Sequence, residues 1–492
     1  MKCFTILIIL LCITSANGHS QFYEFADKDF CLEPVEGKLL QHDLTQIRKT
    51  IIAAHPDPFI YRSKAAWDSS YVELLHYFKR PRTMFDFISK TASWLGELKD
   101  SHVGMDIDQI LELYKEDNSW LIFKLARIEG KFYAASDAEI EFLPFGNELL
   151  EINSMPVDSL FNQAMIFSLE EGASFEARQK YAVTLMSPLI NLLNSFDSEG
   201  EKILVKHCNP KGDTLFSYVK TYTSKDRRKM EWRNYTKMQD IEYTIDSSQG
   251  TGTLKISTFL PRSKRAFEEK VDSFFDSVAK CDVSIILIDL RWNRGGYFEQ
   301  VEYLYNYIDT ISTKRTKTYV SKRSEFDGFS TMTWFSKLFY LSYAKTQKSN
   351  SKTRQNYSFY KLPLGTLDTI RETNQFDQAI RENKYQGTCF LAMNGVSISA
   401  SVDFASWFKE SKRGLILGEQ CMGPLTGTCG NPVLFDLKNT RISVATSTMR
   451  SYTNSKLKVE SDPIFPDVPI KYSVTEFRIK RDPIMEYIKN LK

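Results

Sequence analysis

The fold of the chain is decided by the segment Val283–Leu290, which reads VSIILIDL. An almost unbroken apolar strand of this length is typical of a parallel sheet that is covered on both faces. Thr253–Phe259 reads as a second strand, and Ser263 can cap a helix between the two strands. The apolar face of that helix carries Phe267, Val271, Phe274, Phe275 and Val278. These segments predict a strand–helix–strand unit.

The same pattern continues toward the C-terminus. Thr388–Met393 is another apolar strand, Ala400–Ser411 follows as a helix, and Leu415–Leu417 adds a short strand. A hairpin is expected from Val433–Leu437 and Ile442–Thr448. The half of the chain from residue 240 onward is therefore expected to form an α/β domain with a mostly parallel sheet.

The N-terminal half has a different pattern. Residues 40–100 and 168–195 carry apolar residues at helical spacing. Between them, short strands are expected at Trp120–Leu125, Lys131–Ala135 and Glu148–Ile152.

The composition is that of an ordinary globular protein. The chain has 492 residues, of which 42% are hydrophobic and 25% charged, and this length favours two to three domains. The 64 basic and 61 acidic residues leave a net charge of +3, which gives no support for a nucleic-acid or polybasic membrane partner. Two polar stretches, 223–239 and 344–356, are expected to be a solvated linker and an exposed loop.

Residues 1–18 have the features of a secretory signal peptide. Lys2 precedes the apolar run Phe4–Ile13, and Ala16 and Gly18 supply small residues at −3 and −1 of a cleavage site. The apolar run is too short to span a bilayer comfortably. We therefore expect an exported protein, periplasmic or extracellular, without stable membrane insertion.

Six cysteines follow this segment, and none of them forms a CxxC pair. This spacing argues against a zinc site, and no metal or cofactor is expected. An oxidising compartment would permit disulfides. Cys421 and Cys429 are close enough in sequence to close one loop, and the alternative is that they are buried free thiols.

A candidate nucleophile lies in Asn394–Ser401, which reads NGVSISAS and separates a predicted strand from a predicted helix. Catalytic sites of α/β sheets cluster beyond the carboxyl ends of the strands. A serine at a helix start lies beside free N–H groups, which can stabilise an oxyanion when the serine attacks a carbonyl. The alternative is that these serines only cap the helix.

A serine nucleophile needs a base, and a glycine pair could complete the site. Among the histidines, His102 has the most suggestive context, because it lies in the polar phrase Glu97–Gly104 at the end of a helical pattern. The segment Ile288–Gly296 ends in two glycines whose N–H groups could form an oxyanion hole. Taken singly, the histidine could be structural and the glycines could form a tight turn.

Together these segments resemble the tail-specific (C-terminal-processing) family of serine proteases, in its tricorn-core-like branch. Members combine a helical region that ends in a Ser-His phrase, a PDZ-like segment and an α/β catalytic domain. The corresponding phrases occur here in the same order: Asp100–His102, Gly146–Val157, Asp289–Gly296, Ser397–Ser401 and Glu460 ahead of Pro466-Asp467. The resemblance covers roughly residues 40–475.

The resemblance implies a fold and a domain organisation. The expected fold is α/β, with an N-terminal helical region, a PDZ-like β-rich segment and a ClpP/crotonase-like catalytic domain. The implied domains are residues 19–115 with the catalytic histidine, residues 116–225 as the PDZ-like domain and residues 226–492 as the catalytic domain. The PDZ-like segment either binds a peptide terminus or is purely structural.

The resemblance also implies residue roles. Ser399 takes the place of the nucleophile and His102 that of the general base. Ser101 and Glu460 match the positions that orient the imidazole. The oxyanion hole would be formed by the backbone N–H groups of Gly295, Gly296 and Ala400.

One departure from the bacterial tail-specific branch is informative. That branch uses a Ser–Lys dyad whose lysine follows the nucleophile by some 25 residues within a Gly-Lys pair. Here the position reads Gly423-Pro424, and proline cannot accept a proton. The Ser–His arrangement is therefore the one that the resemblance supports.

These roles imply a serine-type peptidase that acts on peptide or protein substrates, without a nucleic-acid partner. The main alternative is a catalytically silent protein that binds an apolar ligand or a peptide on the same fold. An esterase with the same nucleophile is a further alternative. Retention of all four polar positions favours the peptidase.

Overall fold

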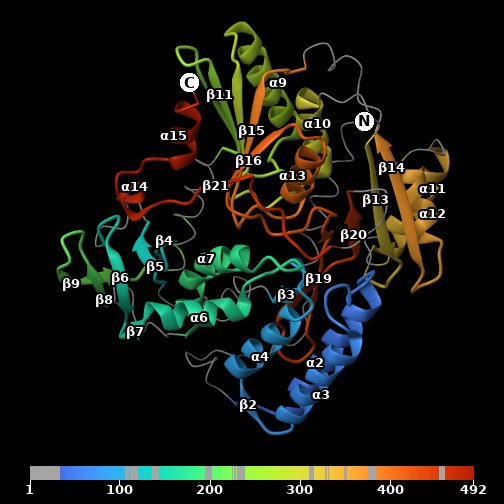
Figure 1. The fold of residues 1–492 in the computed structure, drawn as a ribbon. Coiled ribbons are helices and arrows are strands. Elements are labelled where there is room, and N and C mark those ends of the chain that lie inside the picture. The colour runs from blue at the N-terminus through green and yellow to red at the C-terminus, as the bar shows by residue number, and fades with distance from the viewer. Residues whose placement is uncertain are drawn as a thin grey trace.

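The computed structural model describes residues 34–105, 110, 120–135, 143–193, 202–223, 225, 229, 239–309, 315–326, 330, 332–347, 352–374, 384–453 and 460–491. The predicted signal peptide lies outside the described residues, as does most of the predicted linker 223–239. Figure 1 shows the α/β part with β11, β15 and β16 above the N-terminal helices, with a β-rich region on one side.

The α/β part is built on a six-stranded sheet in the order β10-β11-β12-β15-β16-β21. β10 pairs antiparallel with β11, and every other neighbouring pair is parallel. The strands are β10 (Ile241–Asp246), β11 (Thr251–Ile256), β12 (Ile285–Asp289), β15 (Thr388–Met393), β16 (Gly414–Gly418) and β21 (Val468–Pro469). The α/β fold expected from the sequence is therefore confirmed.

Helices cover both faces of this sheet, as the unbroken apolar strand predicts. Ile286 and Ile288 pack into one core with the helices of the first face, and Leu287 packs on the opposite face against Ile484 and Ile488. The helices of the first face are α9 (Lys264–Lys280), α10 (Phe298–Ile308) and α13 (Ala400–Glu410), and α15 (Pro483–Lys489) covers the second. The alternation follows from the two-residue period of a strand.

The N-terminal region is helical and leads into the β-rich region. Its helices are α2 (Gly37–Ala54), α3 (Lys64–Tyr77) and α4 (Met84–Gly96), with the strand pair β1 (Pro34–Val35) and β2 (Arg82–Thr83). The β-rich region has the strands β4 (Leu125–Ile128), β5 (Lys131–Ala134), β6 (Glu148–Ile152), β7 (Met155–Pro156), β8 (Lys202–Cys208) and β9 (Thr214–Lys220). It also carries α6 (Val157–Phe167) and α7 (Phe175–Leu193).

Two smaller sheets join these regions. One contains β13 (Arg315–Lys322), β14 (Leu367–Asn374), β17 (Cys429–Gly430) and β20 (Met449–Tyr452). The other contains β3 (Gly104–Met105), β18 (Val433–Asp436) and β19 (Ser443–Thr446). The remaining helices are α11 (Trp334–Thr346), α12 (Lys352–Tyr360) and α14 (Val474–Arg478).

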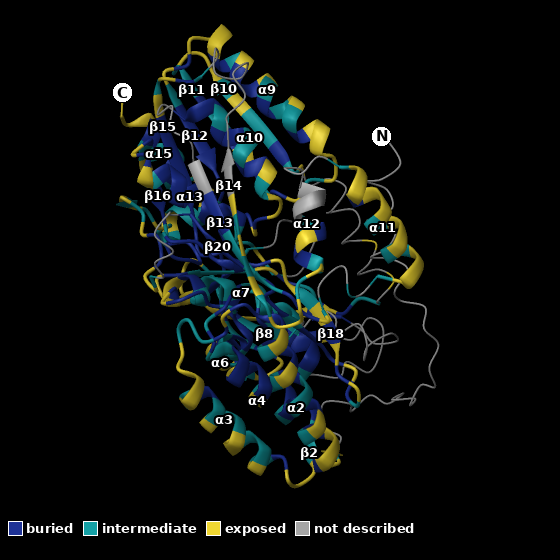
Figure 2. Ribbon diagram, turned by 90° about the vertical axis from the view of Figure 1, so that its right-hand side faces the viewer, coloured by how far each residue is buried: buried dark blue, intermediate teal, exposed yellow. Residues whose placement is uncertain are grey.

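The apolar cores do not follow the sequence order strictly. One core runs from Leu40 through Val219 and also includes Phe435 and Val444 of the β18–β19 hairpin. Figure 2 shows the central strands as largely buried, while α3 and α11 present many exposed residues. The hairpin therefore anchors the C-terminal half of the chain to the N-terminal helices.

Two local expectations differ from the structure. Of the stretch 344–356, which was expected to be a loop, residues 344–346 belong to α11 and residues 352–356 to α12, and residues 348–351 lie outside the described residues. Tyr357 and Phe359 of α12 are buried. The strand expected at Trp120–Leu125 begins only at Leu125. The reason is that Asn191 takes the place of a neighbouring strand, because its side chain bonds both the N–H and the C=O of Leu121.

The expected disulfide is also wrong, because Cys421 and Cys429 are both free thiols. Each is buried in its own surroundings. The Cys421 Sγ donates to the carbonyl of Gly423, and the Cys429 Sγ accepts from Arg450. Burial raises the pKa of the Cys421 thiol to about 12.

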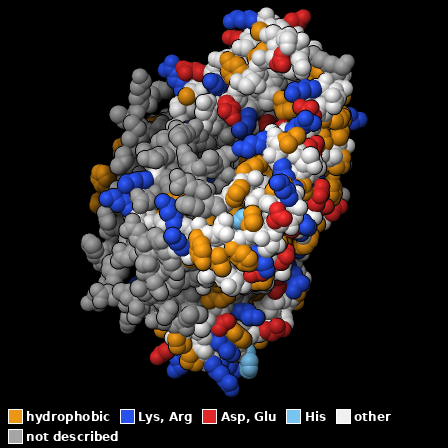
Figure 3. All heavy atoms as spheres, turned by 90° about the vertical axis from the view of Figure 1, so that its left-hand side faces the viewer, with side chains coloured by type: hydrophobic (Ala, Val, Ile, Leu, Met, Phe, Trp, Pro, Cys, Tyr) orange, Lys and Arg blue, Asp and Glu red, His pale blue; other side chains and the backbone are white. Residues whose placement is uncertain are grey.

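The surface mixes charges of both signs, as the even balance of the sequence predicts. Figure 3 shows Lys and Arg side chains interspersed with Asp and Glu over the described atoms of one face. Within the described residues, no helix combines the length and hydrophobicity needed to cross a bilayer.

Candidate active site

The nucleophile candidate Ser399 stands at the N-cap of α13 with an unusual backbone. Its φ is 57° and its ψ is −121°, and its side chain makes no capping hydrogen bond. The neighbouring serines are used structurally: Ser397 Oγ donates to the Leu290 carbonyl at 2.8 Å and Ser401 Oγ to the Asn293 carbonyl at 2.9 Å. Among the described residues, the Ser399 hydroxyl has no hydrogen-bond partner, so helix capping does not account for it.

The surroundings of the turn impose this conformation. A positive φ costs a non-glycine residue free energy and persists only where neighbouring contacts over-determine it. Here the Ile398 N–H donates to the Asn293 carbonyl at 3.1 Å, and the Met422 N–H donates to the Ser397 carbonyl at 3.0 Å. The turn is thereby fixed to the ends of two separate segments.

The glycine pair after β12 lies directly against this turn. Gly295 has a φ of 91°, and a Cβ there would lie 2.8 Å from Ser399 Cβ and 2.9 Å from the Ala400 nitrogen. Gly296 has a φ of 140° and lies so close to the backbone of Phe259 that a Cβ has no room. These positions therefore require glycine for both conformation and space.

Of the three predicted oxyanion donors, two are available. The Gly295 N–H already donates to Asn293 Oδ1 at 2.8 Å. Within the described part of the chain, the N–H groups of Gly296 and Ala400 have no protein acceptor. Free N–H groups beside a nucleophile are the feature that stabilises a developing oxyanion.

The base candidate His102 lies in the loop after α4 and is partly exposed. Its Nδ1 is 3.1 Å from Ser101 Oγ, and its backbone N–H donates to Asp100 Oδ1 at 2.7 Å. The following strand β3 pairs antiparallel with β19. This pairing holds the histidine against the C-terminal half of the chain.

A buried ion pair lies behind Ser101. Glu171 Oε2 accepts both the Ser101 hydroxyl and the Ser101 N–H, each at 2.9 Å. Glu171 Oε1 accepts from Arg450 Nη1 at 2.9 Å, and both side chains of this pair are essentially inaccessible to solvent. The loop between α6 and α7 supplies Glu171, and β20 supplies Arg450.

A second buried pair supports the backbone of the histidine loop. Asp100 Oδ2 accepts from His55 Nε2 at 2.6 Å and from Ser447 Oγ at 2.8 Å. Burial alone would raise the pKa of Asp100, but the hydrogen bond and charge of His55, with a smaller contribution from His102, lower it below its usual range. For Glu171, burial and the neighbouring Asp100 charge raise the pKa, and Arg450 only partly offsets them.

Two sets of residues in this region could hold a metal. His55, Asp100 and Cys429 place their ligand atoms within 4.8 Å of one another, and so do Asp100, His102 and Glu171. However, both oxygens of Asp100 and of Glu171 already accept hydrogen bonds from protein donors. The arrangement therefore favours a charge-compensated hydrogen-bond network over a metal centre.

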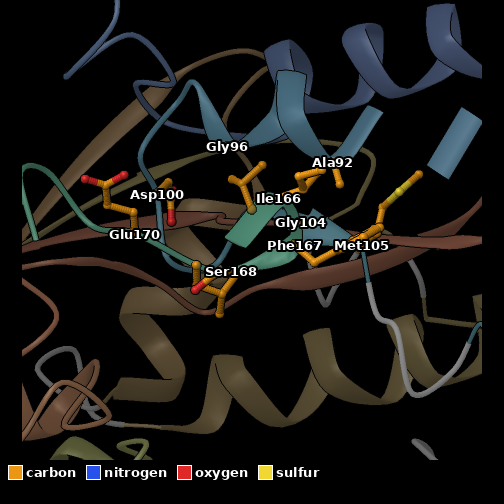
Figure 4. Close-up of a pocket in the computed structure, with 11 residues that line it drawn as sticks. Ala92, Gly96, Asp100, Gly104, Met105, Ile166, Phe167, Ser168 and Glu170 are labelled. Atoms are coloured by element: carbon orange, nitrogen blue, oxygen red, sulfur yellow. The ribbon is translucent and has the colours of Figure 1, made fainter. Parts of the chain in front are cut away.

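A cavity of about 20 Å³ lies behind the histidine loop. Figure 4 shows Asp100 and Glu170 at one end of its lining and Met105 at the other. This volume holds about one water molecule. The cavity is thus too small to accept a substrate side chain.

The two halves of the site are joined by one segment, residues 168–181. At its start, the Gly172 N–H donates to the Lys99 carbonyl at 3.0 Å, next to the histidine loop. Farther along, Ala177 packs with Val396 and Ile398 of the nucleophile turn. Within the described residues, Ser399 Oγ and His102 Nε2 do not form a hydrogen bond, and such catalytic contacts often tighten only when substrate binds.

The predicted site residues are thus brought together in part. Ser101 contacts His102, whereas Glu460 uses its backbone N–H to donate to Thr426 Oγ1 at 3.2 Å and makes no hydrogen bond to His102. Sequence reasoning missed Glu171 and Arg450, because nothing in the local sequence links either of them to the histidine loop. The one available signal was the polar run LEEGAS at residues 169–174, near the start of the stretch predicted to be helical.

Comparison with known proteins identifies the α/β part. Residues 250–470 match Peptidase family S41. This segment contains the glycine pair, Ser399 and every strand of the six-stranded sheet except β10, but it does not extend to His102. No curated protein matches the chain significantly.

Solved structures of CPAF share the fold of nearly the whole chain. A crystal structure of a serine-to-alanine mutant of CPAF has a TM-score of 0.65 at 14% identity and covers 92% of this chain and 97% of its own. Mature CPAF complexed with lactacystin has a TM-score of 0.61 at 14% identity, covering 92% and 98%. Mature CPAF alone has a TM-score of 0.60 at 14% identity, covering 92% and 96%. Residues 250–470 therefore form a domain of Peptidase family S41, in a chain whose fold is similar to that of CPAF.

Proposed function

We propose that the protein is an exported serine peptidase in which Ser399 is the nucleophile and His102 is the general base. The observation that carries the proposal is the state of the Ser399 hydroxyl. It is held in a strained turn without a hydrogen-bond partner among the described residues, while the serines on either side are bonded to the backbone. A strained, unpartnered hydroxyl is the expected state of a nucleophile awaiting substrate.

The chemistry follows from the surrounding groups. Ser399 Oγ attacks the scissile carbonyl while His102 Nε2 takes its proton, and the carbonyl oxygen becomes an oxyanion. The N–H groups of Ala400 and Gly296, which have no acceptor among the described residues, would bind that oxyanion. His102 then protonates the leaving amine, and water hydrolyses the acyl-enzyme in a second round of the same proton transfers. Ser101 orients the imidazole.

Glu460 remains part of the proposed site on the strength of the motif alone. Its position before Pro466-Asp467 matches the orienting glutamate of the tricorn-like branch. Its backbone N–H donates to Thr426 and none of the described hydrogen bonds joins it to His102, so an effect on His102 would arise when substrate binds or the adjacent segment rearranges. A Glu460→Gln variant with unchanged kcat would remove it from the site.

The test is covalent labelling by a fluorophosphonate, which reacts with activated serines. We expect one label per chain, on Ser399, and loss of both label and peptide cleavage in Ser399→Ala. Ser263→Ala is the matched control, because Ser263 also stands at a helix N-cap but its side chain accepts from the Ala266 N–H. A wild-type chain that neither labels nor cleaves peptides would favour the silent binding protein instead.

Two further measurements complete the proposal. Ester hydrolysis without peptide hydrolysis would identify an esterase with the same nucleophile. For export, the full chain is expressed with its first residues and the mature N-terminus is sequenced. We expect cleavage after Gly18, and an intact N-terminus in an intracellular product would contradict export.

A further inference from the structure

We propose that Glu171 is the positioning carboxylate of the site: through Ser101 it sets the tautomer of His102, so that Nε2 is left as the acceptor. The inference rests on the proposed role of His102 as the base. It assigns the positioning to a residue that precedes the peptidase domain of residues 250–470, rather than to one within it.

The direction of the hydrogen bonds carries the argument. The Ser101 hydroxyl has a single proton, and Glu171 Oε2 lies 2.9 Å from its oxygen. An ionised carboxylate can only accept, so the Ser101 proton points to Glu171. Ser101 Oγ can then only accept from His102 Nδ1, 3.1 Å away, and Nδ1 must carry the proton. Neutral His102 thus keeps its lone pair on Nε2, where a general base needs it.

Hydrogen bonds from protein donors hold the Glu171 carboxylate as an acceptor, against the burial and the Asp100 charge that raise its pKa. Oε2 also accepts the Ser101 N–H at 2.9 Å, and Oε1 accepts from Arg450 at 2.9 Å and from the Cys429 N–H at 3.3 Å. Each oxygen therefore faces at least two donors, and the guanidinium supplies the compensating charge. A buried carboxylate with this set of donors is fixed in position and cannot rotate away from Ser101.

A purely structural ion pair would make a different prediction. If the pair of Glu171 and Arg450 served only to hold β20 against the α6–α7 loop, its removal would lower stability and leave the His102 ring unchanged. If Glu171 positions the base, its removal also frees the Ser101 proton to point at Nδ1. The imidazole would then carry its proton on Nε2 and could not act as a base.

The experiment reads the tautomer directly, by ¹⁵N NMR of histidine-labelled full-length protein at a pH where His102 is neutral. The variants are Glu171→Gln, Ser101→Ala and Ser101→Thr, with Glu170→Gln as the matched control. Glu170 is the adjacent buried glutamate, but it pairs with Arg178 and Lys99 instead of Ser101. Peptidase kcat and KM are measured on the same samples.

We expect the Nδ1–H tautomer in the wild type and in Glu170→Gln, and loss of that preference in Glu171→Gln and Ser101→Ala. The kcat should fall by about 100-fold with little change in KM, which is less than the ~10⁴-fold loss caused by a carboxylate in direct contact with a catalytic histidine. Ser101→Thr keeps the hydroxyl and should restore both readouts. If Glu171→Gln fails to fold, Ser101→Ala tests the same relay with the ion pair intact.

The outcomes separate this inference from the proposed function. A wild type without peptidase activity, but with a tautomer that depends on Ser101 and Glu171, would sink the peptidase mechanism and support the positioning role. An active wild type whose kcat and tautomer are unchanged in both Glu171→Gln and Ser101→Ala would overturn the inference. So would a tautomer that responds to Glu460→Gln and not to Glu171→Gln.

Discussion

The nucleophile turn and the histidine loop are built by opposite means. The turn at residues 394–401 owes its geometry to backbone conformation and close packing. Ser399 has a positive φ, and Gly295 lies so close to the turn that a Cβ has no room. The histidine loop owes its geometry to buried charges, His55 with Asp100 and Glu171 with Arg450, which come from separate segments. The turn should therefore respond to changes of shape, and the loop to changes of charge and pH.

The largest effect is expected from removing one charge of the buried ion pair behind the histidine loop. Arg450→Met leaves Glu171 buried without its counter-ion, and losing one partner of a buried pair costs about 3–5 kcal/mol. Denaturant unfolding followed by circular dichroism measures this change. Adding Glu171→Gln to Arg450→Met should recover part of the loss, because the uncompensated charge is then gone. Equal stabilities for the single and the double variant would show that the pair is not coupled.

The next largest effect is expected at the nucleophile turn, whose geometry depends on close packing. Gly295→Ala would place a methyl group 2.8 Å from Ser399 Cβ, in a backbone region with a φ of 91°. We expect the kcat/KM of peptide cleavage to fall by about 100-fold or more, because a nucleophile displaced by about 1 Å loses that much. Gly130→Ala is the control, since Gly130 also has a positive φ of 84° but open space around it. Full activity in Gly295→Ala would show that the close approach is not required.

The pH dependence of stability tests whether buried charges hold the histidine loop in place. Asp100 has a pKa below its usual value of 3.8 in the folded state, so it stabilises the fold above about pH 3.8 and that stability is lost as the pH falls further. Thermal melts of the wild type should therefore show a decline on the acid side that is smaller in Asp100→Asn. Identical acid-side slopes in the two proteins would contradict the charge-based account of the loop.

The smallest effect compares two serines at equivalent helix positions. Ser263 caps α9 with its side chain at a φ of −139°, whereas Ser399 stands at the start of α13 at a φ of 57° without a capping bond. Ser263→Ala should cost about 1 kcal/mol. In contrast, Ser399→Gly should be about 1 kcal/mol more stable than Ser399→Ala, because glycine accepts the positive φ. Equal unfolding midpoints for Ser399→Gly and Ser399→Ala would show that the turn is unstrained.

Much of the fold follows from local patterns in the sequence. The apolar strand at Thr388–Met393 and the strand at Glu148–Ile152 were predicted to the residue, and Ser263 does cap α9. Where prediction failed, tertiary contacts outweighed the local signal. Asn191 satisfies the backbone of Leu121 in place of a strand, and Tyr357 and Phe359 anchor a helix whose other residues are polar. The domain boundaries at 115 and 225 remain predictions.

The sequence alone indicated the strands and helices of the α/β part, the place of Ser399 between a strand and a helix, and the adjacency of Ser101 and His102, because each of these is a local pattern. The positions of Glu171 and Arg450 behind Ser101, and the bond that the Gly295 N–H already makes, became visible in the folded chain. Glu171 lies 70 residues from Ser101 and 279 from Arg450. Hydrogen bonds and buried charges act over a few ångströms in space regardless of chain separation, so no local pattern could reveal these contacts.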